Sequence, residues 1–163
     1  MRTVILVMAV FCLASSLPAQ STGKKKSGLP EPPKKDVPYL IHANLLLETE
    51  ISQAKEESRK DEQMYSIPGA ASPVKTPLSS PEFLFQSESI APEKLAVFKL
   101  DSKNGRREVV VARKKKPVGR PIKISVFRVY ERVFKIRVDD SLPPGEYSLS
   151  PDGSNAVFCF AVE

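Results

Sequence analysis

The sequence predicts an all-β domain that follows a signal peptide and a flexible lead. Three observations predict this organisation. Residues 1–19 run from a positive charge through an apolar stretch to small residues, residues 20–36 are dense in Lys and Pro, and the C-terminal half alternates short apolar runs with turn residues. The first pattern is typical of exported proteins, and the third is typical of strands in an antiparallel fold.

The N-terminal segment has the three parts of a signal peptide. Arg2 supplies the charge, residues 3–13 are apolar, and small residues lead to Ala19. The apolar part is shorter than the roughly 20 residues that span a bilayer. We expect cleavage after Ala19, with Ser16 as the alternative, and a mature protein without a transmembrane span. The predicted location is the periplasm or the medium.

Residues 20–36 are predicted to be a disordered tether, because they cannot bury enough apolar surface to offset the entropy of ordering. Residues 37–163 are then a single β-rich domain. Its only cysteine is Cys159, so no internal disulfide can form and packing must hold the domain together. We expect a monomer.

The domain begins with a predicted strand in residues 39–47. Residues 48–63 are predicted to form a surface helix, since Leu47, Ile51 and Ala54 recur at i, i+4 and i+7. A polar β-ribbon is the alternative for this segment. Four prolines in residues 67–81 exclude both a helix and a central strand, so an extended arm is predicted there.

Short strands fill the rest of the chain. After a strand at residues 83–85, residues 95–101 and 106–112 flank Asn104-Gly105, a strong hairpin signal. A two-residue turn would pair Phe98 with Val111 and Leu100 with Val109. It would also place Asp101 opposite Glu108, and the repulsion of these carboxylates favours a longer loop.

A second hairpin is predicted from residues 122–129 and 133–138. Pairing Val126 with Ile136 gathers the apolar side chains on one face, which indicates a half-buried antiparallel pair. Arg128 interrupts that face, and a β-bulge at Arg128 would explain the interruption.

The last predicted strands, residues 146–149 and 156–162, are joined by a turn that contains Pro-Asp-Gly at 151–153. The preceding sequence, Leu142-Pro-Pro-Gly-Glu-Tyr147, resembles the L-x-P-G-x-Y corner of Ig-like and transthyretin-like domains in exported bacterial proteins. The resemblance implies a small antiparallel β-sandwich in which the Tyr147 hydroxyl bonds backbone. It implies no activity, because a fold does not determine a function.

The sharpest local feature is a basic segment between the two hairpins. Gly119-Arg120-Pro121 within it is similar to an AT-hook, but Val118 stands where that motif has arginine, and the signal peptide argues against a nucleic-acid partner. Contact with an anionic polymer or a membrane surface needs only charge density. The candidate anion-binding residues are Arg113, Lys114, Lys115, Lys116, Arg120, Lys123, Lys135 and Arg137.

No motif in the chain indicates catalysis, a cofactor or a metal. His42 and Cys159 both lie in apolar runs, where packing explains them better than a catalytic dyad. The short acidic and polar clusters at 139–140 and 152–155 carry too few oxygens for calcium. We therefore expect a non-catalytic exported binding or structural module of the cell envelope, acting on an unknown protein or an anionic envelope component. The alternative is a binder of anionic polymers or membrane surfaces through residues 113–123.

Overall fold

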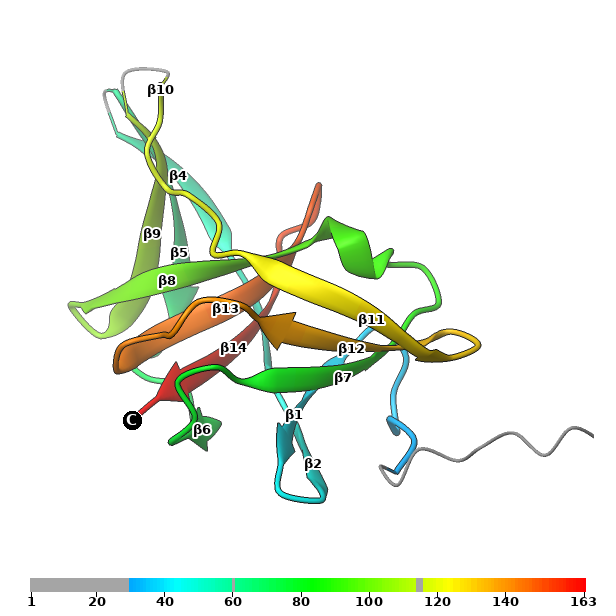
Figure 1. Cartoon of the computed structure of the whole chain (residues 1–163). Coiled ribbons are helices and arrows are strands. Elements are labelled where there is room, and N and C mark those ends of the chain that lie inside the picture. Colours follow the sequence, from blue (N-terminus) through cyan, green and yellow to red (C-terminus); the bar gives the residue numbers. More distant parts are fainter. Residues whose placement is uncertain (1–29, 60, 114–115) are drawn as a thin grey trace, which may run out of the picture.

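The computed structural model describes residues 30–59, 61–113 and 116–163. The predicted signal peptide, residues 20–29 of the predicted tether, and Lys114 and Lys115 therefore lie outside the described residues. The described chain is all-β, as the sequence predicts, with a single turn of 3-10 helix, η1, at Pro92–Lys94 (Figure 1). Within these ranges no helix is long and apolar enough to span a membrane.

Two antiparallel sheets pack face to face. The first sheet has five strands, in the order β11 (Ile124–Tyr130), β12 (Val133–Val138), β7 (Glu82–Gln86), β1 (Pro38–His42) and β2 (Leu45–Glu48). Every pair in it is antiparallel. This matches the predicted all-β class, and the strands come from both ends of the domain.

The second sheet is larger and bends strongly. Its strands follow the order β3 (Glu50–Gln53), β14 (Ala156–Val162), β13 (Gly145–Pro151), β8 (Leu95–Lys103), β9 (Arg106–Arg113), β5 (Glu62–Pro68) and β4 (Lys55–Arg59). The end strands, β3 and β4, are consecutive in the chain and are separated only by Ala54. The sheet therefore curls until its two ends meet, and we call it the curled sheet. Two short strands flank it: β10 (Lys116–Pro117) beside β9, and β6 (Lys75–Thr76) parallel to β14.

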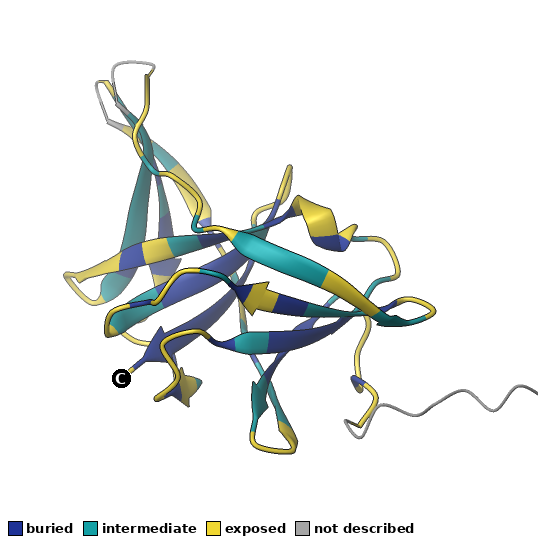
Figure 2. Ribbon diagram, viewed as in Figure 1, coloured by how far each residue is buried: buried dark blue, intermediate teal, exposed yellow. Residues whose placement is uncertain are grey.

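The main core lies between the first sheet and one face of the curled sheet. Phe160 is at its centre: its ring packs edge-on against Phe83, with centroids 5.0 Å apart, and stacks on Tyr147 at 5.5 Å. Figure 2 shows the buried residues concentrated along β7, β13 and β14. Burying aromatic and aliphatic side chains from both sheets is the main stabilising term of this fold.

A second, smaller core fills the interior of the curled sheet. It consists of Ala54, Ile67, Leu100, Val157 and Cys159. Residues of β14 alternate between the two cores, since Phe158 and Phe160 face the first sheet while Val157 and Cys159 face inward. Burial on both faces explains why this strand is continuously apolar in sequence.

The predicted helix at residues 48–63 is wrong, and the alternative, a polar β-ribbon, is correct. The segment forms β3, which pairs with β14, and β4, which pairs with β5. The three apolar residues that suggested a helix do not share a face: Ala54 lies in the second core, whereas Ile51 is 48% exposed. A helix with one narrow apolar stripe gains little burial, so long-range strand pairing wins. The predicted strand at 39–47 is also divided, because Ala43, with φ of 54°, turns the chain between β1 and β2.

The β8–β9 hairpin has the two-residue turn, so the longer loop is wrong. Asn104 and Gly105 have φ of 53° and 74°, as this turn requires, and Asp101 does lie opposite Glu108. The Arg106 guanidinium, 3.2 Å from the Glu108 carboxylate, offsets the repulsion between these two carboxylates. Only residues 101–103 of β8 pair with β9. Residues 95–100 pair with β13 along one edge of β8, and along the other edge Val97 bridges Ile122 of the connection that leads to β11. The expected pairs of Phe98 with Val111 and Leu100 with Val109 are therefore absent from the described ladders.

The second hairpin follows its prediction. Val126 pairs with Ile136, and the register shifts between Arg128 and Tyr130, which is the predicted bulge. Ile136 and Val138 are buried in the main core. The alternation of apolar and polar side chains in each strand was sufficient to predict this register, because one face of the hairpin packs on the core and the other faces solvent.

Two connecting segments lie against the sheets. The arm predicted at 67–81 begins too early, because Ile67 and Pro68 end β5 and pair with β9. The residues after Pro68 connect β5 to the first sheet and contribute β6 to the edge of β14. The described part of the predicted tether, residues 30–36, contacts the domain, so the predicted boundary at Val37 is too late. The Asp36 carboxylate accepts backbone N–H groups of Glu88, Ser89 and Ile90 at 2.8–3.1 Å, which fastens the lead to the loop after β7.

Candidate functional site

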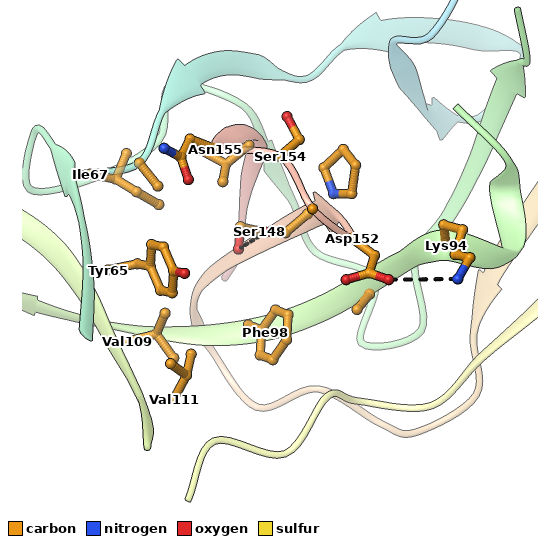
Figure 3. A pocket seen from close by; sticks show the side chains of 16 residues that line it. Tyr65, Ile67, Lys94, Phe98, Val109, Val111, Ser148, Asp152, Ser154 and Asn155 are labelled. Atoms are coloured by element: carbon orange, nitrogen blue, oxygen red, sulfur yellow. Dashed lines mark hydrogen bonds and ion pairs between the residues drawn. The ribbon is translucent and has the colours of Figure 1, made fainter. Parts of the chain in front are cut away.

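A pocket of about 520 Å³ opens inside the curled sheet (Figure 3). Its walls come from β8, β9 and β5, and its floor from β13 and β14. The apolar side chains that line it are Ala54, Tyr65, Ile67, Ala96, Phe98, Val109, Val111 and Val157. Its volume falls within the range of roughly 300–1,000 Å³ that small-molecule sites occupy.

The pocket exists because β8 and β9 separate. Beyond Asp101 and Glu108, β8 follows β13 while β9 follows β5, so the two strands diverge and a wedge opens between them. Alternation along β8 then sends Val97 into the main core, while Ala96 and Phe98 project into the wedge. Ala96 and Phe98 are partly exposed inside the wedge, so a ligand can contact them there.

Few polar groups face the pocket. The hydroxyls of Ser148 and Ser150 on the floor are 3.2 Å apart and bond each other. The Tyr65 hydroxyl bonds none of the described residues. At the mouth, the Lys94 ammonium lies 3.6 Å from the Asp152 carboxylate, and these side chains are 66% and 73% exposed. The Ser154 hydroxyl and the Asn155 amide also line the pocket, and both residues are exposed. The interior is therefore apolar with a few hydroxyls, and the charged groups and the amide stand at the entrance.

The opposite end of the curled sheet's interior is closed by a buried arginine. Arg107 is 0% exposed, and its two terminal nitrogens each donate a hydrogen bond of 2.7 Å to Glu50. It also donates to the backbone carbonyls of Pro68 and Gly69 at 2.9 and 3.0 Å, and lies 3.7 Å from Glu146. Burial alone would raise the pKa of Glu50, but hydrogen bonds from Arg107 and Ser72 and the charge of Arg107 lower that pKa overall. The hydrogen-bonding groups of Arg107 thus have partners within the chain, and this cluster stabilises the fold.

Cys159 lies inside the curled sheet and is 0% exposed. Burial raises the pKa of its thiol to about 12, so the thiolate is not populated near neutral pH. His42 ends β1 in the other sheet, where it pairs with Leu45. The structure therefore does not bring His42 and Cys159 together as a dyad. No group of three or more His, Cys, Asp or Glu side chains suited to a metal ion occurs within the described ranges.

Those of the predicted anion-binding residues that the structure describes do not gather on one surface. Arg113 ends β9 and Lys116 starts β10, at the end of the ribbon that projects from the body of the domain, whereas Lys135 and Arg137 lie on β12 in the first sheet (Figure 1). Arg120 and Lys123 are exposed on the connection that leads back to β11.

The two β12 cations are engaged by neighbours. The Lys135 ammonium lies 3.0 Å from the Glu82 carboxylate on β7. The Arg137 guanidinium lies 3.6 Å from the Asp139 carboxylate and 5.1 Å from the centre of the Phe127 ring. A prediction based on charge count could not foresee this, because the Glu82 that neutralises Lys135 is far away in sequence.

Gly119, in the connection after β10, lies very close to the backbone of β9. Val118 donates its backbone N–H to Val111 at 3.0 Å, and a Cβ on Gly119 would stand 2.7 Å from the Val110 carbonyl oxygen. Only glycine permits this approach to β9. Within the described ranges no ion pair holds Lys116, Arg120 or Lys123, so three of the eight predicted cations are exposed and uncompensated.

Sequence reasoning missed the pocket, because no local pattern marks the point where two strands of a hairpin part. The hydrogen bond expected from the corner motif at residues 142–147 is present: the Tyr147 hydroxyl donates to the Pro143 carbonyl at 2.6 Å. The resemblance to Ig-like exported domains stays a prediction. No protein family model, curated protein or solved structure matches this chain.

Proposed function

We propose that the protein is an exported, non-catalytic binding module and that the pocket of the curled sheet is its binding site. The signal-peptide pattern of residues 1–19 supports export. The observation that carries the proposal is the pocket itself, about 520 Å³ in volume and lined mainly by apolar side chains. A largely apolar concave site with a few placed polar groups is the usual form of a small-molecule site.

The chemistry around the pocket favours binding over catalysis. The one thiol near it, that of Cys159, is buried with a pKa of about 12, so it is a poor nucleophile. The lining contains a single lysine and a single carboxylate, Lys94 and Asp152, and both are exposed at the mouth. Neither group has the buried environment that tunes an acid or a base.

The proposal is tested by filling the pocket. Ala96→Phe adds a ring to the pocket wall without removing a buried contact of the main core, and Phe127→Ala removes an exposed ring from β11 as a matched control. A fragment library is screened by thermal shift on the mature protein and on both variants. A ligand present at 100 times its Kd adds about 2.7 kcal/mol to the free energy of unfolding. Stabilisation of the mature protein and the control, but not of Ala96→Phe, is the expected result. Fragments that stabilise all three equally would contradict the proposal.

A second candidate function rests on the uncompensated cations. Lys116, Arg120 and Lys123 are exposed and adjoin further lysines in the sequence, so the projecting ribbon and the connection that leads back to β11 suit an anionic polymer or membrane surface. Such binding would be steeply salt-dependent, whereas binding in the apolar pocket would not. Salt titration of retention on a heparin column separates the two candidates.

A further inference from the structure

We infer that the pocket of the curled sheet accepts an uncharged, planar aromatic group carrying at most one or two small polar substituents. This inference rests on the proposed function, since it names the ligand class for the same site. It follows from the distribution of charge, of rings and of hydroxyls around the pocket.

The charge distribution excludes a charged group from the interior. Lys94 and Asp152 are the charged lining residues, and they pair with each other at the mouth, 3.6 Å apart. Arg107, further inside the curled sheet, is already matched by the Glu50 carboxylate. A charged ligand group that entered would lose its hydration and meet no opposite charge, and this cost is large in an apolar environment.

The rings favour a planar ligand. Tyr65 projects into the pocket from β5 and Phe98 from β8, which are two different walls (Figure 3). The surfaces between them are supplied by Val109 and Val111. Aromatic side chains gain additional stabilisation from offset or edge-on contact with another ring, beyond the burial of area. A flat ring can make such contacts with both walls, whereas an aliphatic chain gains burial alone.

The hydroxyls set the polar content of the ligand. Ser148 and Ser150 form one hydrogen bond on the floor at 3.2 Å, so one of these two hydroxyls keeps a proton to donate, and the hydroxyl of Tyr65 bonds none of the described residues. The Ser154 hydroxyl and the Asn155 amide also line the pocket, but both residues are exposed. One or two polar atoms of the ligand can therefore be satisfied inside the pocket. A ligand with several polar groups would leave some of them unpaired, each at a cost in affinity.

The test uses two probes with related ring systems. N-phenyl-1-naphthylamine is uncharged and carries one N–H, and 8-anilino-1-naphthalenesulfonate adds a negative charge to the same framework. Fluorescence titration of the mature protein gives the Kd of each, and 1-decanol competes as an uncharged aliphatic ligand. Every titration is repeated on Ala96→Phe, so that only the part of the signal that this variant loses is assigned to the pocket.

We expect the uncharged probe to bind at least tenfold more tightly than the sulfonate, and 1-decanol to displace it only weakly. Phe98→Leu should weaken the uncharged probe severalfold, while Phe127→Leu, on the exposed face of β11, should leave it unchanged. Equal or tighter binding of the sulfonate in the pocket, or stronger binding of 1-decanol, would overturn the ligand class and leave the binding site standing. Uncharged-probe binding that persists undiminished in Ala96→Phe would overturn the site itself, and with it the proposed function.

Discussion

Arg107 on β9 donates hydrogen bonds of 2.7 Å to both carboxylate oxygens of Glu50 on β3, across the interior of the curled sheet. The two strands are not neighbours in the sheet, so this buried pair links opposite walls directly. The guanidinium also binds the carbonyls of Pro68 and Gly69, where the chain leaves β5. The pair thus holds closed the end of the interior that lies away from the pocket.

Removing the arginine should be strongly destabilising. Arg107→Met leaves Glu50 with the hydrogen bond from Ser72 but without an opposite charge. Removing one partner of a buried ion pair costs about 3–5 kcal/mol, and the lower end is expected because the Glu50 side chain is 22% exposed. Urea denaturation followed by circular dichroism measures the loss in the free energy of unfolding. Arg106→Ala is the matched control on the neighbouring position, where the ion pairs with Glu57 and Glu108 are partly exposed and the loss of each should cost about 1 kcal/mol or less. Equal losses in the two variants would show that the buried pair is not a special contact.

The stability of the domain should fall in acid partly through Glu50. Its pKa in the folded state lies below the ordinary value of 4.5, so the unfolded chain takes up the proton first as the pH falls. The stabilisation is therefore complete above about pH 4.5 and is lost as the pH drops through the lowered pKa. Glu50→Gln should be less stable at neutral pH and should show a flatter dependence below pH 4.5 in urea titrations. A pH profile parallel to that of the unmodified protein would contradict the assignment.

Cys159 should react slowly in the native protein. Its thiol is buried and its pKa is raised to about 12, so both access and thiolate population are low. Labelling with a chromogenic disulfide reagent should be slow in buffer and complete within the mixing time in denaturant, and the protein should remain a monomer without reductant. Rapid native labelling, or a disulfide-linked dimer, would mean that β14 is not buried on its inner face.

The corner contact of Tyr147 should contribute measurably to stability. Tyr147→Phe removes the 2.6 Å bond to the Pro143 carbonyl while keeping the ring that stacks on Phe160, and the expected loss is about 1–2 kcal/mol. Tyr65→Phe is the control, since its hydroxyl bonds none of the described residues and its removal should leave the denaturation midpoint nearly unchanged. A negligible loss in Tyr147→Phe would show that the corner bond is not a stabilising feature.

Substitutions of the cations should separate the two candidate functions. Replacing Lys114, Lys115, Lys116 and Arg120 by Gln should leave the melting temperature nearly unchanged. Lys116 and Arg120 are exposed, and exposed charges contribute within about ±0.5 kcal/mol each. If the anionic-surface candidate is correct, the same change should weaken retention on anionic vesicles by about 1 kcal/mol per cation. Lys135→Gln with Arg137→Gln should have a smaller effect, since both cations already have carboxylate partners. Retention that survives all six changes would eliminate this candidate.

Sequence alone determined the features whose causes lie within a few residues of each other. The position of the turn at Asn104-Gly105, the hairpin register of Val126 with Ile136 and the bulge after Arg128 all follow from local conformational preference and alternation. The length of that turn was not predicted, because the contact of Arg106 with Glu108 offsets the repulsion that favoured a longer loop. The all-β class follows from the same patterns. Residues 48–63 show the limit of this reasoning: a weak helical pattern was overruled by pairing with strands elsewhere in the chain.

Only the tertiary structure decided which strands join β8 and β9, and therefore whether a pocket exists. The partners are remote: Arg107 meets Glu50 across 57 residues, and Lys135 meets Glu82 across 53. Such contacts depend on how the whole sheet curls, and the gain from burying both faces of β14 exceeds any local preference. Turns and strand alternation can therefore be predicted from neighbouring residues. The pocket and the ion pairs form only when strands that are distant in sequence pack together.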